Sequence, residues 1–150
     1  MSVGKFCNRQ VVVADRHSDI VAVAKLMRRH HVGDVVLVQD ITVDNKVPVG
    51  IITDRDLVIE LMALEVNLET VNVGDAMSYE LVTCCETDSL CDALQRMQAR
   101  HVRRLVVVDE AGCLSGILTV DDLVELLAEE MSGVARVVMG QPERERRCRV

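Results

Sequence analysis

The chain has 150 residues and a mass of 16.6 kDa, which is room for one compact domain or two small halves that share a core. Its 49% hydrophobic and 27% charged residues are typical of a folded protein, and its formal charge of -7 disfavours nucleic acid as a partner. With one Phe, one Tyr and no Trp, the sequence also lacks the stacking platforms of single-strand binders.

Hydropathy and cysteine usage point to an intracellular protein. No apolar run approaches the roughly 18 residues that cross a bilayer, and the first residues lack the apolar core of a signal peptide. We therefore expect a cytoplasmic protein without membrane insertion. The six cysteines show neither C-x-x-C spacing nor a nearby His cluster, which argues against a zinc site and favours reduced, packed thiols. The adjacent Cys84 and Cys85 are the candidates for redox sensing, although no neighbouring base in the sequence would activate them.

The chain repeats itself. An offset of 70 aligns residues 3–38 with 73–108 without a gap, and an offset of 66 then aligns 50–61 with 116–127. Each repeat begins with a β-branched strand, at Val11–Val13 and Leu81–Thr83. A helix with apolar residues at i, i+3, i+4 and i+7 follows, on the stripes Ile20, Val23, Ala24, Met27 and Leu90, Ala93, Leu94, Met97.

Two further strands and a second helix complete each repeat. The strands are expected at Val35–Val38 and Val49–Thr53, joined through Asp44-Asn45, and at Leu105–Val108 and Leu114–Thr119, joined through Ala111-Gly112. The closing helices are expected at about Asp54–Glu65 and Val120–Met131. The pattern predicts an α+β fold of two tandem β-α-β-β-α repeats.

The repeats define the domain organisation. We assign residues 3–65 to the first repeat, 66–72 to a linker, 73–131 to the second repeat and 132–150 to a C-terminal extension. Residues 142–150 carry four Arg and two Glu and little that could pack, so we expect the extension to be mobile at its end.

A hydroxyl and a carboxylate recur where a strand meets a helix. Thr53 and Asp56, like Thr119 and Asp122, are expected on a first helical turn, where free N–H groups favour phosphate. A carboxylate there can also accept hydrogen bonds from the vicinal hydroxyls of ribose. The same spacing is close to that of a capping box, in which both side chains satisfy the N–H groups of the helix itself. The residues alone do not decide whether these Thr–Asp pairs cap the helix or contact a nucleotide.

The closing signatures GIITDRDL (50–57) and GILTVDDL (116–123) resemble those of the CBS domain, as do VGKFC (3–7), VGDAM (73–77) and HVRRLVVVD (101–109). Two such repeats form the family's tandem pair, the Bateman module. The resemblance implies that a pseudo-two-fold axis relates the repeats and that adenosine derivatives bind between them. It further implies that Thr53 and Thr119 serve phosphate, that Asp56 and Asp122 serve ribose, and that the purine lies between apolar residues such as Val12 and Val82.

Basic residues distinguish the two halves. Arg103 and Arg104 precede the central strand of the second repeat, where the first repeat has Gly33 and Asp34. Arg55 lies within the first signature. We expect these three arginines to be phosphate candidates, with an ordinary exposed face as the alternative.

Catalysis is not expected, because the sequence has no metal-ligand set, nucleophile–base motif or P-loop. We expect a regulatory sensor that has no obligatory cofactor, binds AMP, ADP or ATP, and acts on an unknown regulated protein. The resemblance also implies a homodimer packed through its helices. The alternative function is a ligand-free interaction module that regulates a partner enzyme or transporter.

Overall fold

In a computed structural model, the described backbone comprises residues 1–42, 45–77 and 80–148, and the described side chains further exclude 40–42 and 141–148. The first repeat contains β1 (Val13–Asp15), α1 (Ile20–His30), β2 (Asp34–Thr42), β3 (Asn45–Thr53), α2 (Asp54–Asp56) and the π-helix η2 (Leu57–Met62). The second contains β4 (Thr83–Cys85), α4 (Leu90–Arg100), β5 (Arg104–Val108), β6 (Leu114–Thr119) and α5 (Val120–Cys148). Two short helices lie outside this scheme, η1 (Val3–Lys5) and α3 (Val73–Ala76).

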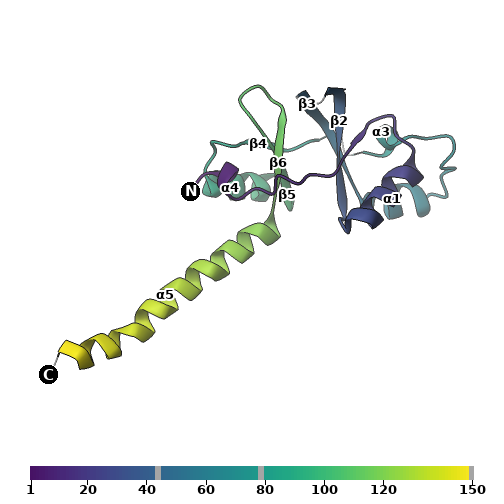
Figure 1. Cartoon of the computed structure of the whole chain (residues 1–150). Coiled ribbons are helices and arrows are strands. Elements are labelled where there is room, and N and C mark those ends of the chain that lie inside the picture. The colour runs from purple at the N-terminus through teal and green to yellow at the C-terminus, as the bar shows by residue number, and fades with distance from the viewer. Residues whose placement is uncertain (43–44, 78–79, 149–150) are drawn as a thin grey trace.

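Each repeat forms a three-stranded mixed sheet, and the two sheets stand side by side in Figure 1. In the first sheet β1 is parallel to β2, and β2 is antiparallel to β3. The second sheet repeats this arrangement with β4, β5 and β6. These sheets confirm the α+β fold with two β-α-β-β-α repeats.

The first helix of each repeat covers its own sheet with the predicted stripe. Helix α1 is capped by Asp19, whose carboxylate accepts a hydrogen bond from the Ala22 N–H, and its C-cap His31 is left-handed with φ of 53°. Both methionines of the stripes are buried, so they are core residues as predicted. Leu94 departs from the prediction, because it is 39% exposed at the edge of the stripe in α4.

The central strands are buried on both faces, which explains their unbroken apolar runs. In β2, Val35 and Leu37 face the first helical core, whereas Val36 and Val38 join a separate cluster between the two sheets. Val106 of β5 and Ile117 of β6 complete the buried part of this cluster. The two sheets are therefore held together by β-branched side chains.

The leading segments of the repeats are exchanged in space. The N–H of Gly4 bonds to Glu86 O at 2.9 Å in the second repeat, and Val3 is fully buried in that repeat's core. Reciprocally, the N–H of Val73 bonds to Ser18 O at 3.1 Å, and Val73 is buried in the core of the first repeat. Each core thus contains a segment that belongs by sequence to the other repeat.

Several predicted boundaries are wrong. Strands β1 and β4 begin two residues later than predicted, and the second helix of the first repeat ends at Met62, partly as a π-helix. The last helix does not end near Met131 but continues to Cys148, and it projects from the body in Figure 1. Asp44 of the first predicted turn lies outside the described residues, whereas Gly112 of the second has φ of 80°, as a tight turn requires. No described helix is long and apolar enough to cross a membrane.

Candidate functional site

A cleft of about 470 Å³ opens between the end of β3 and the start of β5. Strand β3 delivers the first signature to it, and the segments before β4 and β5 form the opposite wall. Six of the nine residues predicted for ligand binding line this cleft: Thr53, Arg55, Asp56, Val82, Arg103 and Arg104. Its volume lies within the range of small-molecule sites.

Both signature turns form capping boxes. The Asp56 N–H donates to Thr53 Oγ1 at 3.1 Å, and the Thr53 N–H donates to Asp56 Oδ2 at 2.8 Å. The second turn repeats this pattern, with Thr119 and Asp122 at 3.2 and 2.7 Å. The capping interpretation is therefore confirmed, and a ligand contact at either turn would have to use the atoms that the cap leaves free.

The two capping boxes differ in one hydrogen bond. The Thr119 hydroxyl donates to Asp122 Oδ2 at 2.7 Å, so its proton is already used. Among the described residues, the Thr53 hydroxyl accepts from Asp56 but donates to none of them. Asp56 Oδ1 likewise accepts no hydrogen bond within that part of the chain. The first turn can therefore offer one donor and one carboxylate oxygen to a ligand.

Arg104 is bound across the repeats. Its Nη1 donates to Asp34 Oδ2 at 2.7 Å, and Asp34 lies opposite Thr53 in the β2–β3 ladder. Burial raises the pKa of Asp34, the Arg104 charge counteracts this, and the Asp54 carboxylate adds to the increase. Arg104 is therefore first a structural cation, although it also lines the cleft.

The other two arginines are freer to bind an anion. Arg55 forms no ion pair with any described residue. Arg103 lies 3.7 Å from Asp121, but this pair is 76% and 85% exposed and is screened by water. The backbone of Arg103 is fixed because its carbonyl accepts the Val120 N–H at 2.8 Å. A fixed backbone with a weakly paired guanidinium suits phosphate binding.

Sequence reasoning missed several residues of the cleft. Asp54, Glu80 and His101 line it together with the apolar Ile51, Leu81, Val102 and Val106. The cleft therefore holds three carboxylates, Asp54, Asp56 and Glu80, beside three arginines. The sequence did contain a signal for the contact between Asp34 and Arg104. The two residues occupy equivalent positions of the repeats and have opposite charges, and equivalent residues close to a pseudo-two-fold axis lie next to each other.

The remaining three predicted residues lie elsewhere. Val12 packs at the margin of the first core, and its carbonyl accepts the Val36 N–H at 3.0 Å. Thr119 closes the second capping box. Asp122 borders a smaller hollow of about 170 Å³, lined also by Phe6, Glu125, Leu126 and Glu129. Three carboxylates with no lining arginine make this hollow unfavourable for phosphate.

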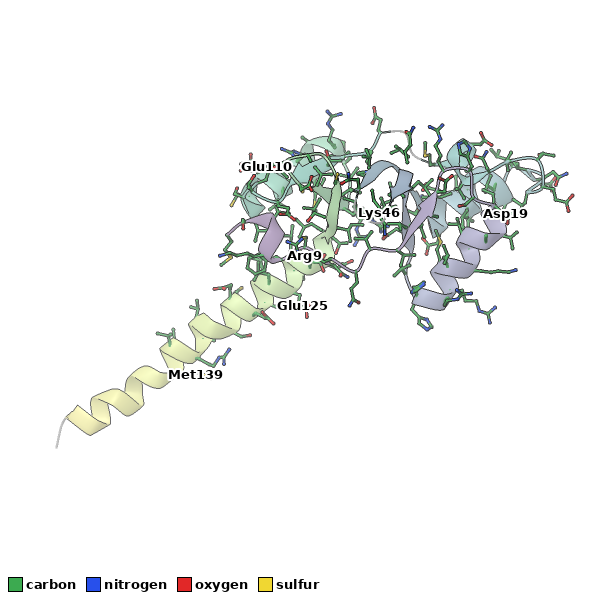
Figure 2. All side chains as sticks on the ribbon, turned by 45° about the horizontal axis from the view of Figure 1, so that its top comes forward. Arg9, Asp19, Lys46, Glu110, Glu125 and Met139 are labelled. Atoms are coloured by element: carbon green, nitrogen blue, oxygen red, sulfur yellow. The ribbon has the colours of Figure 1, made fainter. Side chains whose placement is uncertain are left out.

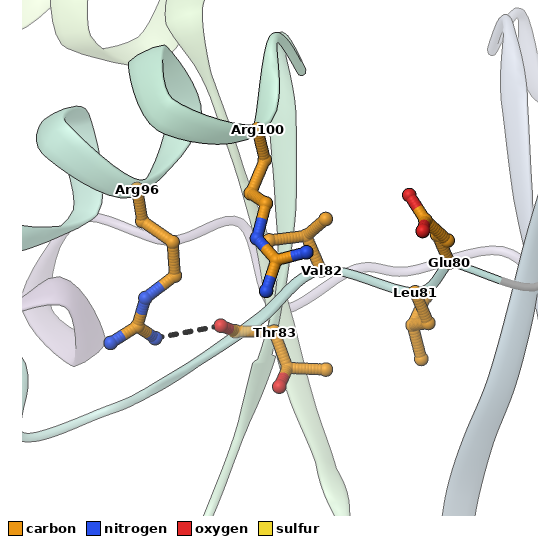
Figure 3. Close-up of a pocket in the computed structure, with 6 residues that line it drawn as sticks. All are labelled: Glu80, Leu81, Val82, Thr83, Arg96 and Arg100. Atoms are coloured by element: carbon orange, nitrogen blue, oxygen red, sulfur yellow. Dashed lines mark hydrogen bonds between the residues drawn. The ribbon is translucent and has the colours of Figure 1, made fainter.

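A second hollow shares the wall Glu80–Val82 with the cleft (Figure 3). Arg96 and Arg100 reach into it from α4, and its volume is about 490 Å³. Arg96 is already engaged, because its Nη1 donates to Thr83 O at 2.7 Å and to Asp88 at 3.1 Å. This hollow carries no Thr–Asp turn, so we place the candidate site in the cleft.

Two of the cysteines, Cys7 and Cys84, lie in surroundings that make their thiols unreactive. Cys84 is 1% exposed, and burial raises its pKa to about 11, with Asp88 adding to the increase. Burial also raises the pKa of Cys7. Both shifts keep the thiol protonated and therefore poorly nucleophilic. No group of three or more His, Cys, Asp or Glu side chains that could hold a metal occurs among the described residues.

A model of the CBS domain matches residues 3–63 and 73–129. The chain belongs to the CBS domain family. It is a tandem CBS pair, and such pairs are non-catalytic modules. The CBS domain-containing protein YhcV of Bacillus subtilis is 34% identical over 135 residues, which cover 89% of this chain and 91% of that protein. The uncharacterized protein MK0525 of Methanopyrus kandleri is 35% identical over 84% of this chain, which spans only 62% of that relative.

Solved CBS structures share the fold of this pair. The protein PAE2072 of Pyrobaculum aerophilum, solved in complex with AMP, is 24% identical with a TM-score of 0.72, over 85% of this chain and 99% of that one. The CBS domain pair of protein MJ0100 was solved with 5'-methylthioadenosine and S-adenosyl-L-methionine. It is 20% identical with a TM-score of 0.73, over 85% of this chain and 99% of that one. At these identities the likeness concerns the fold.

Proposed function

We propose that this CBS pair is a regulatory sensor that binds one adenosine nucleotide in the cleft between β3 and β5. The observation that carries the proposal is that the Thr53 hydroxyl proton and Asp56 Oδ1 bind no described residue and lie beside Arg55, which has no ion pair there, and Arg103, which is only loosely paired. Thr53 and the arginines would bind phosphate, Asp56 would bind ribose hydroxyls, and the purine would lie against Val82 and Leu81. The AMP complex of PAE2072 supports a nucleotide, and the complex of the MJ0100 pair with 5'-methylthioadenosine and S-adenosyl-L-methionine supports adenosine derivatives more broadly.

The charges of the cleft favour a ligand with few phosphates. Asp54, Asp56 and Glu80 oppose the three arginines, and Arg104 is neutralised by Asp34. A triphosphate would bring more negative charge than Arg55 and Arg103 balance. AMP is therefore favoured over ATP, and the cationic S-adenosylmethionine is the natural competitor to test.

A ligand can regulate this protein only if it binds two of the protein's conformational states with different affinities. The cleft is formed by both repeats, so a ligand in it would bias their relative position. A homodimer formed through the repeat helices would transmit that change, and Val58, Ile59 and Met62 of η2 offer an exposed apolar surface for it. The regulated protein would recognise the altered assembly.

A thermal-shift panel of AMP, ADP, ATP, S-adenosylmethionine and NAD tests the proposal. A ligand at 100 times its Kd should stabilise the wild type by about 2.7 kcal/mol, which is several degrees for this length. The shift should disappear in Asp56→Ala and persist in Asp122→Ala. If no ligand shifts the wild type while both variants melt lower, both aspartates are only caps. The satisfied capping boxes would then favour the second candidate, a ligand-free interaction module.

A further inference from the structure

The last helix leaves the body with an apolar stripe that no described part of its own chain covers. Figure 2 shows Glu125 and Met139 on the projecting part of α5. Along the helix, a spacing of three and four residues places five apolar side chains, each 60–73% exposed, in one row: Val124, Leu127, Met131, Val134 and Val138. This is the a/d pattern of a coiled-coil helix.

Equivalent apolar positions of the two closing helices differ in burial. Leu61 and Leu127 are equivalent by the offset of 66, yet Leu61 is 5% exposed and Leu127 is 61% exposed. In the first repeat the chain turns back after η2, and Val66, Leu68 and Val71 pack in the cluster around Leu61. In the second repeat α5 runs straight on for 29 residues in all, about 43 Å.

The sequence of α5 is a poor helix former without support. Gly133 and Gly140 each disfavour a helix by about 1 kcal/mol, and β-branched Val134, Val137 and Val138 lose side-chain freedom in it. A Cβ at either glycine would meet nothing within 4 Å, so no other part of the described chain supports that side. Helices of this kind depend on packing of an apolar face.

Charge points to a second copy of the same helix as the partner. Residues 121–130 contain five acidic residues and no basic residue, whereas residues 136–148 contain four arginines and two glutamates. Two parallel copies would place the five carboxylates side by side, whereas two antiparallel copies pair acidic with basic halves. We propose that α5 forms an antiparallel two-stranded coiled coil with α5 of a second chain.

The heptad fixes the register of this pair. An antiparallel arrangement centred between Ser132 and Gly133 sets Met131 against the partner copy of position 134 and Leu127 against that of position 138. All apolar a and d positions from 127 to 138 are then matched. The small Ala128 and Ala135 flank the seam and allow close approach.

Light scattering on the full chain gives the first test. Leu127→Glu with Val134→Glu places two charges in the stripe and should raise the dissociation midpoint, which is the concentration at which the mass halves, by about tenfold or more. This shift is expected also where the CBS bodies hold the same two chains together. Ser132→Glu with Met139→Glu adds the same charge on the opposite side of α5 and should leave the mass unchanged. All four positions are on exposed parts of α5, and an unchanged melting profile of the body verifies the fold. An equal dissociation midpoint for the stripe variant and the wild type would overturn the proposal.

Photocrosslinking gives the second test, which reads the register directly. Benzoylphenylalanine at position 127 should crosslink two chains, with the adduct mapped near residue 138 of the partner copy. The same group at position 132 should give no dimer. Adducts near residue 127 of the partner copy, or wild-type chains that stay monomeric and bind phospholipid vesicles through α5, would contradict the antiparallel pair.

Discussion

Asp34 and Arg104 occupy equivalent positions of the two repeats and bind each other at 2.7 Å. Asp34 lies opposite Thr53 in its sheet, and Arg104 lies opposite Thr119 in the other. The ion pair therefore stands between the two capping turns, close to the pseudo-two-fold axis. It makes the surroundings of the two capping turns unequal in charge, because only one of the pair is a cation.

We predict that this pair couples the repeats. Both side chains are about a quarter to a third exposed, so removing one partner leaves the other partly buried and unpaired. Arg104→Met should destabilise the protein by about 1–3 kcal/mol and raise the pKa of Asp34 further, since the Arg104 charge now opposes the effect of burial. A double-mutant cycle with Asp34→Asn, measured by urea unfolding, should give a coupling energy of about 1 kcal/mol. Additive effects would show that the pair contributes no coupling.

Arg103 should contribute to nucleotide binding without contributing to stability. Its guanidinium is exposed and its pairing with Asp121 is loose, so Arg103→Ala should change the free energy of unfolding by less than about 0.5 kcal/mol. The affinity for AMP should fall about tenfold, because a charge-assisted bond to phosphate is lost. Calorimetric titration beside a melting curve separates the two effects. A weaker affinity accompanied by a clearly lower Tm would assign Arg103 a structural role instead.

The two threonines form a matched pair. Thr53→Ala and Thr119→Ala each remove an N-cap, so each should destabilise the chain by about 1 kcal/mol. Only Thr53→Ala should weaken AMP binding, because the Thr119 proton is already given to Asp122. Equal losses of affinity in the two variants would mean that the difference between the capping boxes has no functional consequence.

Much of this architecture could be predicted from the sequence because the same pattern of residues occurs twice in it. The offset between Thr53 and Thr119 located both turns, and the alternating core and interface residues of β2 follow from its apolar run. Which turn faces the arginines depends on packing between sheets, which no local pattern encodes. The end of α5 was missed for a related reason: Arg-rich composition indicates solvation, but it does not end a helix.

Alkaline pH should destabilise the fold through Cys84. Its pKa of about 11 in the folded chain exceeds the ordinary value of 9.0, so between these values the unfolded chain releases a proton that the folded chain retains. Stability then falls as pH rises from 9 to 11, by up to about 2–3 kcal/mol from this group. Urea unfolding across that range should show a shallower decline in Cys84→Ala than in the wild type. Identical slopes would exclude Cys84 as the source.

The number of nucleotides bound by one chain tests the central claim most directly. Isothermal titration of the full chain with AMP should give one site per chain, absent in Asp56→Ala and retained in Asp122→Ala. Two sites per chain, or a single site that survives Asp56→Ala, would contradict the assignment of binding to the cleft between β3 and β5.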